Sequence, residues 1–239
     1  MAKPRLDGRI ALITGASRGI GAALARRFAA EGARLVLAAR TTGGLEEVDD
    51  EIRATHGQDA APTLVKVDLE AGDDIDRLAA AISQRFDRLD ILVANAGLLG
   101  TLGPIHQIEP AEWDRVMAVN LNANFRLMRM FDPILRAVDA GRAIFVGSGA
   151  AHGKRPYWGS YAVSKAGLEM MAMVWAAETE KTRLRVNVVN PGGTRTGMRA
   201  IAYPGEDPMT LKPPEALGEV FVELASVSCR RHGEVVRPG

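Results

Sequence analysis

Short, almost entirely apolar segments alternate with helical patterns along this chain, and that alternation is the strongest constraint on its fold. ILVA (91–94) and RVNVV (185–189) are two such segments. A strand with one face in solvent alternates apolar and polar residues, whereas a strand buried on both faces is apolar nearly throughout. Buried strands separated by helices are typical of a parallel sheet with helices on both faces. The sequence therefore predicts a doubly wound, three-layer α/β/α sandwich.

The pattern can be followed through most of the chain. Strands are expected at 9–14, 34–39, 63–67, 90–94, 143–147 and 185–189. Helices are expected at 20–31, 45–56, 73–86 and 157–181, and one or two more within 110–138, with Asn120 as a candidate break. The 239 residues contain no repeat or linker, so one domain spanning 1–239 is expected. The Gly- and Pro-rich stretch 191–214 is the expected mobile excursion.

Composition narrows the class of protein. Thirty Lys and Arg against 29 Asp and Glu leave a net charge of +1, without the basic excess of a nucleic-acid-binding protein. The longest uncharged run, 91–108, is interrupted by glycines and a proline, so no membrane span is expected. The single cysteine, Cys229, is expected to be an inert thiol near the end of a late helix, and it fits a cytoplasmic protein. Four scattered histidines have no ligand spacing, so no metal site is expected.

A glycine-rich segment, TGASRGIG (14–21), joins the first expected strand to the first expected helix. Glycines at 15, 19 and 21 permit a tight turn and close approach of a ligand to the backbone. The helix N-terminus offers free N–H groups to a pyrophosphate. The spacing differs from the commoner G-x-G-x-x-G, and a tight turn without a ligand is the alternative.

Arg40 directly follows the second expected strand, where NAD-binding folds of this kind carry an acidic residue for the ribose hydroxyl. Arg40, together with Arg18 in the glycine turn, favours the 2′-phosphate of NADP, although NAD stays possible. Two solvated arginines are the alternative.

The fifth expected strand runs into Ser148, and the following helix carries Tyr161 and Lys165. Residues four apart share one face of a helix, so the phenol and the amine are expected in one site. A nearby positive charge is expected to lower the tyrosine pKa from about 10, which makes Tyr161 a candidate general acid/base. Ser148 is then placed to hydrogen-bond a carbonyl or hydroxyl oxygen of a substrate.

Taken together, the chain resembles the short-chain dehydrogenase/reductase family over nearly its whole length. The matching segments are TGASRGIG, VDL, NAG, VNLNANF, VGSGA, YAVSK and NPGGTRT. Within that family, NAGLLG, WGSYAVSK and RLRVNVVNPGGTRTGMRA are most similar to the bacterial YciK-type oxidoreductases. The resemblance implies a Rossmann-type fold and hydride transfer between a nicotinamide cofactor and a ketone or secondary alcohol.

The resemblance also implies roles for individual residues. Asn120 matches the asparagine whose main chain holds a water near the lysine, Ser148 the substrate-orienting serine, Tyr161 the proton donor and Lys165 the ribose-binding lysine. Expected cofactor contacts are Gly15, Ser17, Arg18, Gly19, Ile20, Gly21, Arg40, Asp68, Leu69, Asn95, Ala96, Gly97, Tyr161, Lys165, Pro191, Gly192, Thr194 and Thr196. The short C-terminal GEVVRPG departs from the longer final strand common in the family.

Three further expectations concern the surroundings of the site. Residues 196–211 are expected to form a substrate lid whose apolar members Met198, Ile201, Tyr203 and Met209 cover an apolar substrate, with Leu98 and Leu99 opposite. Apolar residues on several faces of 157–181 predict a homodimer or homotetramer. A catalytically silent dinucleotide-binding regulator is the alternative function, which the intact Ser148, Tyr161 and Lys165 disfavour.

Overall fold

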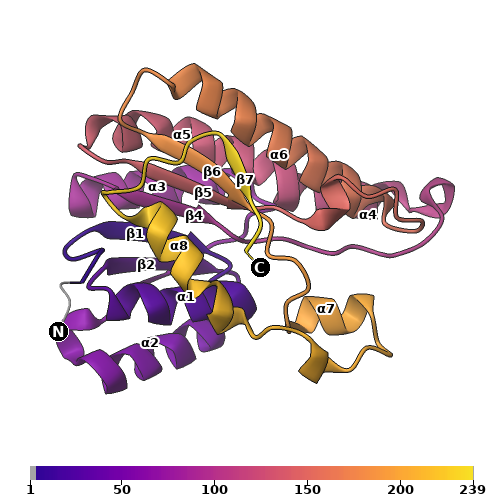
Figure 1. Ribbon diagram of the computed structural model, residues 1–239, viewed down its shortest axis with the longest axis horizontal. Coiled ribbons are helices and arrows are strands. Elements are labelled where there is room, and N and C mark those ends of the chain that lie inside the picture. Colours follow the sequence, from indigo (N-terminus) through magenta and orange to yellow (C-terminus); the bar gives the residue numbers. More distant parts are fainter. Residues whose placement is uncertain (1–3, 239) are drawn as a thin grey trace.

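A seven-stranded parallel sheet forms the centre of the computed structural model, which describes residues 4–238 (Figure 1). The strand order is β3-β2-β1-β4-β5-β6-β7, so the chain winds outward in both directions from the middle of the sheet. The strands are β1 (Ile10–Thr14), β2 (Arg34–Ala39), β3 (Thr63–Lys66), β4 (Ile91–Ala94), β5 (Arg142–Val146), β6 (Arg185–Val189) and β7 (Glu234–Val236). This topology confirms the predicted doubly wound, single-domain α/β sandwich.

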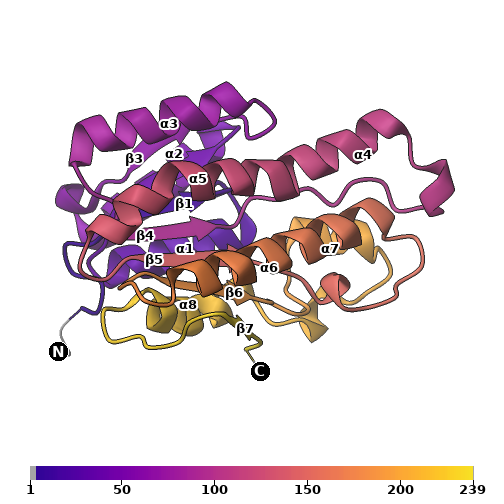
Figure 2. The ribbon, with the colours of Figure 1, turned by 90° about the horizontal axis from the view of Figure 1, so that it is seen from above.

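Helices cover both faces of the sheet. One face carries α1 (Gly19–Ala30), α2 (Thr42–His56) and α8 (Gly218–Ala225). On the other, α3 (Gly72–Phe86), α5 (Ala123–Ala137) and α6 (Gly159–Thr179) lie side by side (Figure 2). Two shorter helices, α4 (Pro110–Met117) and α7 (Gly197–Ala202), belong to the connections that follow the carboxyl ends of β4 and β6.

The two cores explain why the strands are apolar throughout. In β1, Ala11 and Ile13 belong to the core under α1, α2 and α8, whereas Ile10 and Leu12 belong to the core under α3, α5 and α6. Successive strand residues point to opposite faces, so a strand covered on both sides has no solvent-facing position.

Several boundaries and elements differ from the predictions. The expected break at Asn120 is a π-helical segment, Ala118–Asn122, that joins α4 to α5 without ending the helix. The excursion 191–214 is more ordered than expected, because it contains α7 and the short 3₁₀ segment Pro208–Thr210. Cys229 was wrongly placed in a late helix: α8 ends at Ala225, and Cys229 is buried in the loop that follows. Helix α8 and strand β7 had no counterpart in the predictions.

Two buried guanidinium groups connect the amino end of the sheet to the end of α8 and the loop that follows it. Arg142 donates from Nε to the carbonyl of Ser226 at 3.0 Å and from Nη2 to that of Val227 at 2.9 Å. Arg9 donates to the carbonyl of Ala225, at the end of α8. Burial lowers the pKa of both side chains, in Arg9 to about 10. These arginines satisfy carbonyls at the end of α8 and in the two residues after it.

Candidate active site

The glycine turn packs directly against the segment after β4. Gly15 has a φ of +65°, and a Cβ there would lie 2.9 Å from the Cα of Ala96. A Cβ on Gly21 would lie 2.2 Å from the carbonyl oxygen of Gly15. Asn95 fixes the turn by donating its amide to the carbonyls of Thr14 (2.9 Å) and Gly15 (3.1 Å). Both glycines are therefore required by close approach of the backbone, as the motif predicted.

The N-terminus of α1 is open to an anionic ligand. Arg18 precedes the helix in an extended conformation without a side-chain cap, and the first turn contains no acidic residue. The leading N–H groups and the positive end of the helix dipole fit a pyrophosphate. Thr196 lies beside this turn, since its methyl carbon would be 3.5 Å from a Cβ on Gly19. The structure thus brings the first and last expected cofactor segments together.

The two expected phosphate-binding arginines differ in their surroundings. Arg18 is exposed, whereas Arg40 points its Nη1 to Oε1 of Glu70 at 3.4 Å. The same carboxyl binds Arg115 at 3.0 Å. Asp68, two residues before Glu70, accepts a hydrogen bond from the Glu70 N–H, and its neighbour Leu69 is buried. Sequence reasoning missed Glu70, whose carboxyl group pairs with both Arg40 and Arg115.

The expected catalytic trio meets at the carboxyl end of β5. Ser148 begins the 3₁₀ turn Gly149–Ala151, and its Oγ accepts a hydrogen bond from the N–H of Ala150. Tyr161 and Lys165 are both buried on α6. Lys165 donates from Nζ to the carbonyl of Val146 at 2.8 Å, and its Nζ lies 5.9 Å from the centre of the Tyr161 ring.

The pKa of Tyr161 moves opposite to the sequence prediction. Burial raises it, and a hydrogen bond with Ser148 only partly opposes the increase. The same burial lowers the pKa of Lys165 from 10.5 to about 8. A neighbouring positive charge alone would lower the tyrosine pKa, but removing both groups from water disfavours both charged forms.

Asn120 is held by its side chain. Its Oδ1 accepts from the N–H of Leu98 at 2.7 Å, and its Nδ2 donates to the Leu98 carbonyl at 2.8 Å and to Ser164 Oγ at 3.0 Å. The Asn120 carbonyl accepts from Nδ2 of Asn124 at 2.8 Å. A Cβ on Gly97 would lie 3.3 Å from Asn120 Oδ1 and 3.5 Å from Lys165 Nζ. Asn120, Gly97 and Lys165 therefore converge on one point.

The segment after β6 consists of successive tight turns. Gly192 has a φ of +65°, and its N–H donates to Oδ1 of Asn190 at 3.1 Å. Thr194 donates from its hydroxyl to the Pro191 carbonyl at 3.1 Å, and Thr196 caps α7 by accepting from the N–H of Arg199. These bonds turn the chain from the sheet edge toward α1.

A family model described as short chain dehydrogenase matches residues 9–207. The chain belongs to the short-chain dehydrogenase family. It is an oxidoreductase of the NAD(P)-dependent dehydrogenase/reductase type.

Individual relatives support this membership. An uncharacterised oxidoreductase of Escherichia coli K12, YciK, is 39% identical over 226 residues, which cover 95% of this chain and 89% of the relative. A short chain dehydrogenase from E. coli CFT073, solved with NADPH, is 39% identical, with a TM-score of 0.93 and coverage of 99% of both chains. One from Shigella flexneri, solved with NADP, is 38% identical, with the same TM-score and coverage.

In this dehydrogenase, aromatic side chains and one arginine pack together between α6 and the expected lid. Trp158 packs edge-on against Tyr161, with ring centres 5.7 Å apart, and lies 5.7 Å from Tyr203. Arg155 donates to the Tyr203 hydroxyl at 2.7 Å. The sequence leaves the role of Arg155 open and assigns none to Trp158, although Trp158 begins the WGSYAVSK segment.

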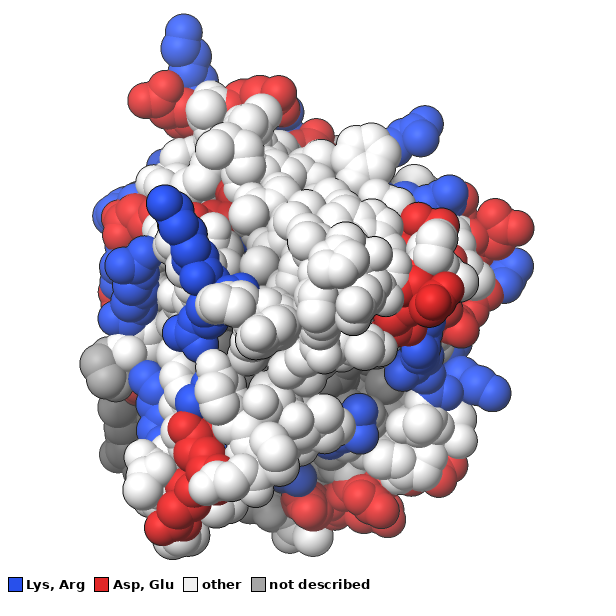
Figure 3. Space-filling view, turned by 90° about the vertical axis from the view of Figure 1, so that its right-hand side faces the viewer, with Lys and Arg blue, Asp and Glu red and all other residues white. Residues whose placement is uncertain are grey.

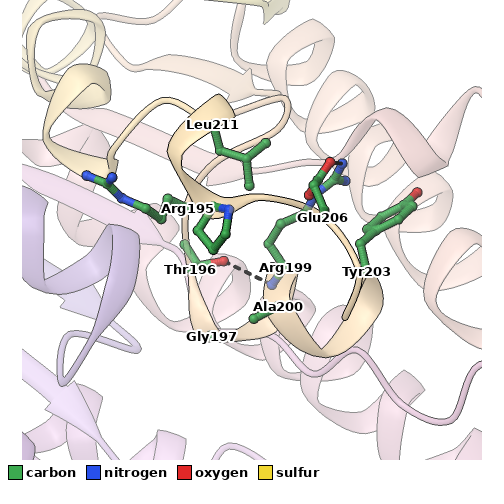
Figure 4. A pocket seen from close by; sticks show the side chains of 9 residues that line it. Arg195, Thr196, Gly197, Arg199, Ala200, Tyr203, Glu206 and Leu211 are labelled. Atoms are coloured by element: carbon green, nitrogen blue, oxygen red, sulfur yellow. Dashed lines mark hydrogen bonds and ion pairs between the residues drawn. The ribbon is translucent and has the colours of Figure 1, made fainter.

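A cavity of about 300 Å³ lies within the expected lid itself (Figure 4). Arg199 and Glu206, which line it, form an ion pair at 2.6 Å, and Tyr203 lies beside them. Of the apolar lid residues, Met198 packs in the cluster around Tyr161 and Leu99, whereas Ile201 and Met209 are 74% and 76% exposed. Ile201 and Met209 therefore do not cover the site in this arrangement.

The surface around the carboxyl end of the sheet is mostly uncharged at its centre, with charged groups of both signs along its borders (Figure 3). Within residues 4–238, no three His, Cys, Asp or Glu side chains are grouped to hold a metal ion. Over the same range, no helix has the length and hydropathy to cross a membrane.

Proposed function

We propose that this dehydrogenase is NADP(H)-dependent and interconverts a ketone and a secondary alcohol, with Tyr161 as general acid/base. The observation that carries this proposal is the hydrogen bond between partly buried Ser148 and buried Tyr161, beside buried Lys165. The nicotinamide, when bound, supplies or accepts the hydride.

The protein's part is to bind the reacting oxygen and to move one proton. In reduction, Ser148 donates a hydrogen bond to the carbonyl oxygen, and the Tyr161 phenol transfers its proton to that oxygen as the carbon receives the hydride. The raised pKa of Tyr161 keeps the phenol protonated and ready to donate. Oxidation requires the phenolate, and positive charge at Lys165 or on an oxidised nicotinamide stabilises it.

The proposed preference for NADP(H) rests on the two arginines near the glycine turn and on the relatives solved with NADP and NADPH. Release of Arg40 from Glu70 accompanies phosphate binding in this proposal. Charge-assisted contacts of this kind contribute about 2 kcal/mol, or roughly 30-fold in affinity. Fluorescence titration should therefore show tighter binding of NADPH than of NADH, and equal or tighter NADH binding would contradict the preference.

Replacement of Tyr161 by Phe tests the proposed chemistry. Turnover of any active substrate from a carbonyl panel should fall about 10²–10⁴-fold, because the phenol is lost. NADPH affinity should change little, since the open end of α1 is untouched. Unchanged turnover would reject the proton-donor role. NADPH binding by the wild type without turnover of any compound would instead favour a regulatory dinucleotide-binding protein.

We further propose that residues 196–211 form a lid and that α6 forms a subunit interface. The contacts of Tyr203 with Arg155 and Trp158 support a lid that rests on the loop before α6. Hydrogen exchange in 196–211 should slow with NADPH and substrate. Exposed Val163, Met170 and Val174 on α6 and exposed Phe125 on α5 support a homodimer or homotetramer. The free thiol of Cys229 and the use of NADPH fit action in the cytoplasm.

A further inference from the structure

A buried carboxyl group lies one helical turn beyond Lys165. Glu169 of α6 is only 8% exposed. Its Oε1 lies 2.7 Å from Nε2 of His152, and its Oε2 is buried without a hydrogen-bond partner. Burial of a half-satisfied carboxyl group is costly, so such a group calls for an explanation. The proposed role of Tyr161 and Lys165 does not use it.

Glu169 lies beside both ends of the turn that begins with Ser148. On the far side it binds His152, which directly follows Gly149–Ala151. On the near side, a Cβ on Gly147 would lie 3.9 Å from Glu169 Oε2. Glu169 therefore lies against the two points where the Ser148 turn leaves and rejoins the rest of the structure.

The turn itself behaves as one piece because its own hydrogen bonds connect Ser148 to His152. The N–H of Ala151 donates to the Ser148 carbonyl at 3.1 Å, and the N–H of His152 donates to the Gly149 carbonyl at 3.4 Å. The Ser148 Oγ accepts from the Ala150 N–H at 3.2 Å. A continuous set of hydrogen bonds therefore runs from His152 to the Ser148 hydroxyl.

We propose that Glu169 is a positioning residue, which holds His152 and thereby fixes the Ser148 hydroxyl against Tyr161. This inference rests on the proposed function, since it concerns the serine that binds the reacting oxygen. Glu169 acts through Ser148 and touches neither the substrate nor the reacting atoms. An apolar side chain would fill the same space at a lower desolvation cost, but it would give His152 no acceptor.

The first test measures the pKa of Tyr161 directly and needs no substrate. In a Tyr157→Phe, Tyr203→Phe background, Tyr161 is the sole remaining phenol of three, and its ionisation is followed by ultraviolet absorbance. Ser148→Ala removes a hydrogen bond that favours the phenolate and should raise the Tyr161 pKa by about 1. Glu169→Ala should raise it in the same direction, with Lys165 present throughout. In a Ser148→Ala background, Glu169→Ala should have no further effect.

The second test separates positioning from stability. With NADPH and an active carbonyl substrate, Glu169→Ala and His152→Ala should each lower kcat about tenfold and leave NADPH affinity within about twofold. His152→Gln keeps an N–H donor and should recover most of kcat. Glu178→Ala, at an exposed position of the same helix, is the matched control and should change neither kcat nor the Tyr161 pKa.

The outcomes distinguish the possibilities. An unchanged Tyr161 pKa in folded Glu169→Ala, or an equal shift in the Ser148→Ala background, would overturn the positioning role. If Glu169→Ala does not fold by circular dichroism, Glu169→Gln replaces it, because the amide oxygen still accepts from His152, and a partial shift is then expected. Absence of turnover with every carbonyl compound would count against the proposed function, while the Tyr161 titration would still decide the role of Glu169.

Discussion

Lys165 should make the stability of this protein depend on pH in a direction unusual for a lysine. The amine is buried, and its pKa is lowered from 10.5 to about 8. The unfolded chain therefore retains a proton between these two values that the folded chain has lost. Stability rises with pH wherever the unfolded state binds more protons. The cost of burying the charged amine is greatest below about pH 8 and is relieved as pH rises.

The magnitude follows from the two pKa values. Between about pH 6.5 and about pH 9.5, linkage predicts a gain of about 2 kcal/mol in the free energy of unfolding from Lys165 alone. Lys165→Met abolishes this titration and also removes the donor to the Val146 carbonyl. The lost hydrogen bond costs about 1–3 kcal/mol, but this cost does not depend on pH. The difference between the two proteins, followed across pH, therefore isolates the buried charge.

Urea unfolding of cofactor-free wild type and Lys165→Met at several pH values measures that difference. Other titrating groups are common to both proteins and cancel. The wild type should gain about 2 kcal/mol on the variant as pH rises. A difference that stays constant within about 0.5 kcal/mol, or that moves the other way, would refute the lowered pKa and the burial argument behind it.

Three other perturbations follow from the packing. Arg142→Met leaves the carbonyls of Ser226 and Val227 without donors and should lower the free energy of unfolding by about 3 kcal/mol; exposed Arg129→Met should change it little. Gly21→Ala places a Cβ 2.2 Å from the Gly15 carbonyl and should weaken both folding, by about 1–3 kcal/mol, and NADPH binding. Gly43→Ala, with open space around it, is its control. Met170→Lys on the exposed face of α6 should reduce the mass measured by light scattering to that of the monomer, and a monomeric wild type would contradict the proposed interface.

Features set by local sequence were predictable. A strand buried on both faces must be apolar, and a backbone that approaches another closely requires glycine. Both requirements are visible in the sequence, so the sheet and the turn around Gly15 and Gly21 could be located in advance. The positions of Ser148, Tyr161 and Lys165 followed from strand ends and helical spacing. The direction of the Tyr161 pKa did not follow, because spacing shows which groups are neighbours but not how much water they lose.

Contacts between distant segments could not be predicted. The pair His152–Glu169 joins a loop to a helix, the pair Arg155–Tyr203 joins two loops, and no periodicity in either partner indicates the other. Helix α7 is six residues long and lies among glycines and prolines, so its local signal is weak. Strand β7, three residues long, forms because β6 provides an edge for it to pair with.

The π-helical segment Ala118–Asn122 places one more residue in its turn than an α-helix would. An α-helix rotates by about 100° per residue, so the extra residue offsets the angular phase of α4 from that of α5. Deletion of one residue here would let a regular helix run from Pro110 to Ala137 and would rotate α4 by roughly a quarter turn. Val116, whose side chain would clash at 2.6 Å with a Cβ on Gly100, would then leave that contact. Length variation at this point is therefore a way to reorient α4 while the sheet and α5 stay in place.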